Sequence, residues 1–175
     1  DRRTKDLTVT AENSADSASI ADFKRQKRYR LMWMGTKYEP GTVKVVAYNE
    51  KGDAVAEKEI HTAGKPDHIE LVADRNEIKA DGKDLSFVTV RVVDKEGNLC
   101  PDAQHLIKYA VKGAGTYRAG ANGDPTSLEL FHVPQMKVFN GMMTAVVQST
   151  DKPGEITLTA TGKGLKSGRL VLISK

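Results

Sequence analysis

The feature that most constrains this chain is a repeated alternation of apolar and polar residues in short segments. The segment SFVTVRVV, residues 86–93, places Val88, Val90 and Val92 on one side of an extended backbone. Four other segments show the same alternation: RYRLMW (Tyr29, Leu31, Trp33), TVKVVAY (Val43, Val45, Ala47), LIKYAVK (Ile107, Tyr109, Val111) and EITLTAT (Ile156, Leu158, Ala160). Successive side chains of a β-strand point to opposite faces, so the alternation predicts half-buried antiparallel strands.

Turn-forming residues separate these segments. They are EPG (39–41), KGD (51–53), ADG (80–82), EGN (96–98) and KPG (152–154). Many short strands between such turns, with almost no helical periodicity, indicate an all-β fold of the sandwich or barrel type. The polar segment 12–28 lacks a usable apolar face, and we expect a long loop there, with at most one helical turn. We expect Trp33, Val45, Val88, Val90, Ile107, Ile156 and Leu158 to be largely buried.

Two similar strand–turn–strand units suggest two domains. VVAYNEKGDA (45–54) and VRVVDKEGNL (90–99) share one pattern at a spacing of 45 residues. Between them, Gly64, Lys65 and Pro66 interrupt the alternation, as a linker does. We therefore predict one domain over residues 1–64 and a second over residues 65–175.

Composition narrows the function classes. The net charge of +4 comes largely from FKRQKRYR (23–30), and no basic stripe or nucleic-acid-binding motif accompanies this cluster. No apolar run approaches the roughly 18 residues that a membrane helix needs. The single Cys100 has no partner for an internal disulfide. The chain begins at Asp1 without a signal peptide, and we interpret it as a processed protein or a piece of a longer one. We expect neither nucleic acid nor membrane as a partner.

No motif predicts catalysis or a cofactor. The four histidines (His61, His68, His105 and His132) lack metal-ligand spacing, although His61 and His68 flank the linker and could approach each other. The nucleophile elbow, the Walker loop and the dinucleotide fingerprint are missing from the sequence. GKGLKSG, residues 162–168, resembles a phosphate loop but lies between two predicted strands. We predict no metal, no cofactor and no catalytic pair of carboxylates.

Two features have a ligand-binding and a structural interpretation. Trp33 could stack on a sugar ring, but its alternation with Tyr29 and Leu31 favours a core position. In GANGDPTSLELF, residues 120–131, Asn122 and Asp124 are weak candidates for ligand contacts. In the structural interpretation, Asn122–Gly123 takes positive-φ turn positions, Asp124 accepts from backbone amides, and Leu128, Leu130 and Phe131 return to the core or to a neighbouring domain.

Residues 29–103 strongly resemble the C-terminal, non-catalytic part of glycoside hydrolase family 2 β-galactosidases from Bacteroides-type gut bacteria. The resemblance is carried by YEPGT, TAGKP, IKADGKDLSFVTVRVVDKEGNLCPDA and NGDPTSLELF. The closing GEITLTATGKGLKSG, residues 154–168, is similar to the last strands of invasin-type bacterial immunoglobulin-like domains. This resemblance implies two consecutive immunoglobulin-like β-sandwiches. The family's earlier strand pair has no counterpart here, so we expect the first domain to be either truncated at its N-terminus or completed by other strands.

The resemblance also implies a function. The catalytic carboxylates of such enzymes lie in an upstream barrel that has no counterpart here, so we expect the chain itself to hydrolyse no glycoside. Its role would be to support the barrel, to contribute to a dimer interface or to line the approach to the active site. The partners would be the upstream domains of the parent enzyme, a second copy in a homo-oligomer, or carbohydrate. The parent would be periplasmic or secreted. The alternatives are a carbohydrate-binding module, which the low aromatic content of 6% disfavours, and a self-contained enzyme.

Overall fold

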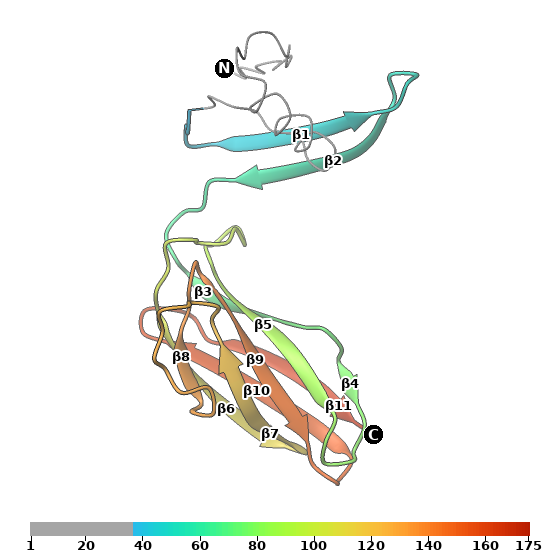
Figure 1. Cartoon of the computed structure of the whole chain (residues 1–175), viewed down its shortest axis with the longest axis vertical. Coiled ribbons are helices and arrows are strands. Elements are labelled where there is room, and N and C mark those ends of the chain that lie inside the picture. Colours follow the sequence, from blue (N-terminus) through green and yellow to red (C-terminus); the bar gives the residue numbers. More distant parts are fainter. Residues whose placement is uncertain (1–36) are drawn as a thin grey trace, which may run out of the picture. The chain divides into compact units, whose positions relative to one another are not determined.

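The computed structural model describes residues 37–175, shown in colour in Figure 1. The alternating segment around Trp33, the basic cluster of residues 23–30 and the polar segment 12–28 lie outside the described residues. Within the described part every regular element is a strand, which confirms the all-β prediction. The strands are β1 (Thr42–Tyr48), β2 (Ala54–His61), β3 (His68–Ala73), β4 (Glu77–Ile78), β5 (Leu85–Val93), β6 (Leu106–Gly113), β7 (Gly115–Ala121), β8 (Gln135–Lys137), β9 (Met142–Ser149), β10 (Gly154–Gly162) and β11 (Gly168–Ser174).

Strands β3 to β11 form a β-sandwich of two sheets (Figure 1). One sheet has the strand order β3-β5-β9-β7, and the other has the order β4-β11-β10-β6-β8. All neighbouring strands are antiparallel except β4, which pairs with β11 in parallel. The chain changes sheets between β3 and β4, so its first strands contribute to both layers.

The core lies between the two sheets and follows the alternation in the sequence. Val88, Val90 and Val92 of β5 are fully buried, and Ile156 and Leu158 of β10 are buried against them in one apolar cluster. The predicted burial of Ile107 is also confirmed. Burying such side chains contributes about 1.5–3 kcal/mol each, so the facing rows are the main source of stability for the sandwich.

The prediction that Val45 is buried is wrong. Strands β1 and β2 form an antiparallel sheet of their own, in which Val43 lies opposite Ile60. Val43 and Val45 share one face, as the alternation predicts, but Val45 is 40% exposed. Alternation identifies which side chains share a face of a strand, whereas burial also needs a second layer over that face.

A buried carboxylate fastens the linker to the sandwich. Asp94 is 1% exposed, and its Oδ2 accepts a hydrogen bond of 2.7 Å from the backbone N–H of Gly64. Its Oδ1 accepts from the backbone N–H groups of Glu96 at 3.0 Å and Asn98 at 2.8 Å. The Gly64 hydrogen bond is the main cause that lowers the pKa of Asp94 to about 2, with further help from Asn98 and Glu96 against the opposing effect of desolvation. The carboxylate therefore holds the predicted boundary region and the β5 turn together.

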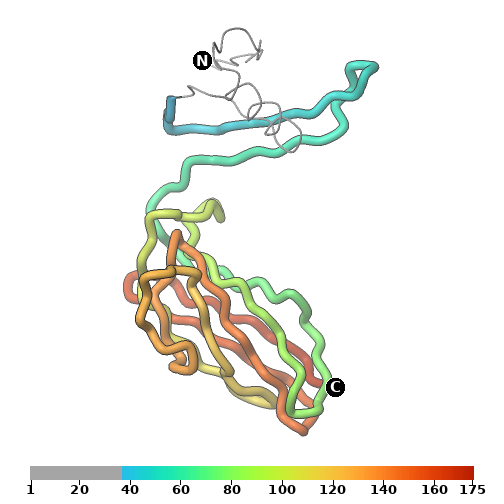
Figure 2. The backbone as a smooth tube through the Cα atoms, in the orientation of Figure 1, coloured from blue at the N-terminus to red at the C-terminus, as the bar shows by residue number. Residues whose placement is uncertain are grey.

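The C-terminal strand is joined to an early part of the sandwich. Ile173 of β11 pairs with Glu77 of β4, and the backbone N–H of Lys175 donates to the carbonyl of Ile78 at 3.0 Å. The Lys175 ammonium also forms an ion pair with the Glu77 carboxylate. Figure 2 shows the red end of the chain beside the green segment that holds β4. The fold is therefore closed by residues about a hundred positions apart, because β4, the second strand of the sandwich, pairs with its last strand, β11.

Leu158→Ala should lower the free energy of unfolding by about 2–5 kcal/mol, because it leaves a cavity between the sheets. Leu128→Ala is a matched control, since Leu128 is 96% exposed and the same substitution there should change stability by less than about 0.5 kcal/mol. Urea unfolding of the two variants measures the difference. Equal losses would contradict the assignment of Leu158 to the core.

Asp94→Ala should lower the melting temperature by about 5–10 °C at neutral pH. The folded pKa of Asp94 lies below its ordinary value of 3.8, so its contribution is fully present above pH 3.8 and is lost as the pH falls towards about 2. The gap in melting temperature between the two proteins should therefore be constant near neutrality and narrow below about pH 4. Thermal scans at several pH values test this, and a gap that stays unchanged down to pH 2 would contradict it. Asp151→Ala, in an exposed turn, is the control.

Candidate functional site

The candidate ligand loop connects the two sheets, because it runs from β7 of one to β8 of the other. The carboxylate of Asp124 accepts from the backbone N–H of Thr126 at 2.8 Å and from its hydroxyl at 2.7 Å. These two hydrogen bonds, with the hydroxyl bond the larger cause, lower the pKa of Asp124. The side-chain oxygen of Asn122 accepts from the Asp124 N–H, and its amide nitrogen donates to the carbonyl of Lys137 at 3.0 Å. Both candidate residues therefore bond within the protein.

Further hydrogen bonds fasten the rest of the loop. The Glu129 carboxylate accepts from the backbone N–H of Lys137, with both oxygens at 3.2 Å. The carbonyl of Phe131 accepts from the Gly120 N–H at 2.8 Å and from the Tyr117 hydroxyl at 3.4 Å. The loop is thus attached to β8 at one side and to the edge of β7 at the other.

Gly120 is required by the protein's own packing. A Cβ atom at this position would lie 2.5 Å from the Tyr117 hydroxyl and 3.1 Å from the Met143 methyl group. Tyr117 stacks on Tyr109 with ring centroids 5.6 Å apart, and the Tyr109 hydroxyl donates to the sulfur of Met143. Burial, with a smaller effect of Tyr117, raises the pKa of Tyr109, so this hydroxyl stays protonated. The space beside Gly120 is therefore filled by side chains of the sandwich.

The apolar side chains of the loop point outwards. Leu128 is 96% exposed, and Leu130 and Phe131 are each 61% exposed. The expectation that these residues return to the core of this domain is therefore wrong. Asn122 also lacks the positive φ that we expected, although Gly123 has a φ of 76°. The loop therefore uses its polar side chains for hydrogen bonds within the protein and presents these three apolar side chains to solvent.

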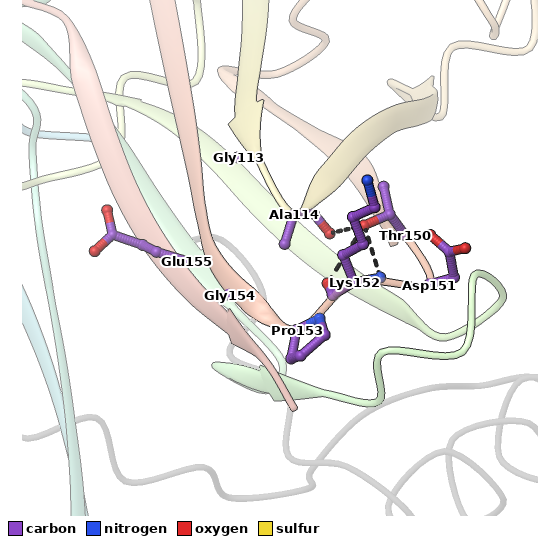
Figure 3. Close-up of a pocket in the computed structure, with 8 residues that line it drawn as sticks. All are labelled: Gly113, Ala114, Thr150, Asp151, Lys152, Pro153, Gly154 and Glu155. Atoms are coloured by element: carbon purple, nitrogen blue, oxygen red, sulfur yellow. Dashed lines mark hydrogen bonds between the residues drawn. The ribbon is translucent and has the colours of Figure 1, made fainter.

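An open depression lies at the end of the sandwich where the β6–β7 and β9–β10 turns meet (Figure 3). The Thr150 hydroxyl donates to the carbonyl of Ala114 at 3.1 Å, which joins the two turns. The side chains of Asp151, Lys152 and Glu155 point away from one another in Figure 3. The depression therefore brings no acid, base or nucleophile together, and sequence reasoning gave no signal for it.

The other candidate groups are scattered. His61 bonds to the Thr42 hydroxyl at 2.8 Å, whereas His68 bonds to Asp67 at 3.1 Å. Across residues 37–175 no three histidine, cysteine, aspartate or glutamate side chains come close enough to hold a metal ion. GKGLKSG joins β10 to β11, so no helix follows it. Over the same part of the chain no helix is long and apolar enough to cross a membrane.

Strands β3 to β11 thus define a β-sandwich, and the loop between β7 and β8 exposes apolar side chains on it. Comparison with known protein families shows which family this chain belongs to. The family described as glycoside hydrolase family 2 C-terminal domain 5 matches residues 69–171, and a domain of unknown function matches residues 9–56. The first match spans more than half of the chain. The chain belongs to the C-terminal domain 5 family of glycoside hydrolase family 2, which confirms the resemblance seen in the sequence.

Similar proteins are longer enzymes. A β-galactosidase of Bacteroides ovatus is 52% identical over 134 residues, which cover 77% of this chain and 16% of that protein. The crystal structure of a glycosyl hydrolase family 2 member from Bacteroides cellulosilyticus has a TM-score of 0.74 at 35% identity, covering 80% of this chain and 18% of that one. A β-glycosidase from Bacteroides vulgatus has a TM-score of 0.75 at 26% identity, with coverages of 78% and 18%. The chain therefore spans about a sixth of the length of the relatives it matches.

Asp124→Ala should lower the melting temperature of this chain by a few degrees, because the Thr126 backbone and hydroxyl lose their acceptor. We expect the sugar affinity of the parent enzyme to stay unchanged. Thermal unfolding of the chain and the KM of the parent measure the two effects, with Asp151→Ala as the control for a surface aspartate. An unaltered melting temperature together with a severalfold higher KM would identify the loop as a binding element.

Proposed function

We propose that this chain is a non-catalytic accessory region of a glycoside hydrolase family 2 β-galactosidase, which supports the catalytic barrel of its parent through direct packing. The parent acts in carbohydrate degradation and is periplasmic or secreted, as the resemblance to enzymes of Bacteroides-type bacteria implies. The partners that we propose are the upstream domains of the same polypeptide, with a second copy of the parent as a further one.

One observation carries this proposal. The loop between β7 and β8 uses its polar side chains for its own hydrogen bonds and exposes Leu128, Leu130 and Phe131. Apolar side chains that are exposed to water are unfavourable, and their burial against an apolar partner lowers the free energy. A sugar site would instead need free donors and acceptors beside its aromatic rings. The loop therefore fits a protein contact better than a ligand contact.

The domain division is also part of the proposal. We place one domain at residues 1–64 and an immunoglobulin-like one at residues 65–175. Two observations support the boundary. The matches to the two families share no residue, and Gly64 lies in the interval between them. The strands before Gly64, β1 and β2, also form a sheet of their own.

A carbohydrate-binding module is the second candidate function. Phe131 and Phe87 are exposed aromatic side chains, at 61% and 46%, and could stack on a pyranose ring. Affinity electrophoresis of the isolated chain in galactan and other polysaccharide gels tests this function. We expect no retardation, and we also expect no hydrolysis of aryl-galactosides by the chain alone. Retardation that Phe131→Ala abolishes would favour the binding module.

The triple variant Leu128→Ser, Leu130→Ser, Phe131→Ser tests the accessory role. It should leave the melting temperature of the isolated chain nearly unchanged, because these side chains are exposed there. In the full-length parent it should lower the melting temperature by several degrees and leave the KM unchanged. Val171→Ser is the control, since Val171 is an exposed apolar residue of β11. A parent that tolerates the triple variant as well as the control would contradict the proposed role of the loop.

A further inference from the structure

An apolar row of side chains crosses the outward face of the four-stranded sheet, beside the threonine pair Thr89–Thr144. Phe87 of β5 lies opposite Val146 of β9, which in turn lies opposite Ala119 of β7. Their inward neighbours Val88 and Val147 are fully buried, so this row points away from the core. With three further side chains it forms a surface that we call the Phe87 face: Val72, Leu85, Phe87, Ala119, Met142 and Val146. Phe87, Val72 and Met142 are 46%, 49% and 37% exposed.

The other sheet has a different outward face. Along β10 and β6 its outward positions are mostly polar, whereas β11 adds the exposed Val171 and Ile173; the β10 and β6 positions hold Thr157, Thr159, Thr161, Lys108, Lys112 and Ala110. This is the usual arrangement of an antiparallel sheet, in which one face packs on the core and the other meets water. The two outward faces therefore differ in degree, since an aromatic ring, Phe87, lies only on that of the four-stranded sheet among the described strands of the sandwich.

Paired charges lie at both ends of the Phe87 face. Beyond Met142, Arg91 of β5 bonds to Glu70 of β3 at 2.7 Å. Beyond Leu85, Arg75 bonds to Asp84 at 2.7 Å. A partner that covers the apolar row would leave these two ion pairs at the rim. An apolar centre with a polar rim is the anatomy of a protein–protein interface.

The size of the face points to one kind of occupant. Two separate chains form a stable complex when each contributes about 800 Å² and 20–30 residues, far more than the six side chains here. A covalently attached neighbour needs less, because the tether supplies a high effective concentration. The matched relatives carry this region within a chain about six times as long. The occupant that fits is therefore a domain of the same polypeptide.

We propose that the Phe87 face is the docking surface for an apolar face of an upstream domain of the parent enzyme. This rests on the accessory role proposed above and assigns it to a particular surface. Packing of the two faces fixes the sandwich on the parent, and the loop between β7 and β8 lies beside this contact because the Phe131 carbonyl accepts from Gly120 of the edge strand β7.

Site-specific thiol labelling tests the proposal. Phe87→Cys places a thiol in the centre of the face, and Ile173→Cys places a matched thiol on the other sheet, since Ile173 is 41% exposed. The natural Cys100 is 4% exposed and gives a low background. In the isolated chain both thiols should react with a maleimide at similar rates. In the full-length parent the thiol at position 87 should react roughly tenfold more slowly than the thiol at position 173, as read by peptide mass spectrometry.

Each other outcome overturns the docking proposal. Equal rates in the parent would mean that the face is open there. Protection that disappears on dilution to a monomeric parent would assign the face to a second copy, and protection that requires added polysaccharide would assign it to carbohydrate. Equal labelling rates in the parent, together with a lower melting temperature of its triple loop variant, would contradict the docking surface but still support the accessory role. Equal labelling rates in a parent that also tolerates the triple loop variant would overturn both the docking proposal and the accessory role.

Discussion

The structure depends on the contact between two rows of β-branched and aliphatic side chains, one on β5 and one on β10. Val88, Val90 and Val92 leave one sheet every second residue and meet Ile156 and Leu158 of the other. Because the side-chain period of a strand is two, a slip of one residue in either strand would move its whole row to the solvent side. The outward position of Phe87 follows directly, because it is the neighbour of Val88 on β5.

Polar groups near the turns are satisfied locally, and this decides which surfaces remain for other molecules. Asp94 accepts hydrogen bonds from the linker and its own turn, while Asp124 and Glu129 do the same for the loop between β7 and β8. Carboxylates held in this way are not available to a substrate or a metal ion. The exposed apolar side chains include the aromatic rings of Phe131, in that loop, and of Phe87, on the strand β5 that precedes Asp94, and such side chains fit a protein partner.

The sequence predicts the strands well because their signal is local. The segments around Val88, Ile107 and Leu158 form strands with the expected inward residues, and the turn glycine Gly52 has the positive φ that its turn requires. The position of Val45 was mispredicted because burial depends on a second layer, which no local pattern specifies.

The candidate site was only partly predictable for a similar reason. The acceptor role of Asp124 follows from the turn chemistry of an aspartate two residues before a threonine. The outward direction of Leu128 and Leu130 does not, since apolar residues usually return to a core. Phe87 alternates with Thr89 and Arg91, a pattern that places it outwards and could have drawn attention to an aromatic ring on a solvent face.

The pairing of β11 with β4 and β10 affects the order of events during synthesis. Leu172 of β11 is fully buried, and the strand lies between its two neighbours in the five-stranded sheet. A chain that emerges from the ribosome from its N-terminus therefore cannot complete this sheet until its final residues are free. Until then the apolar faces of β5, β6 and β10 stay open to water and to other nascent chains. Closure of the sandwich therefore waits for β11, whichever of its other strands have already paired.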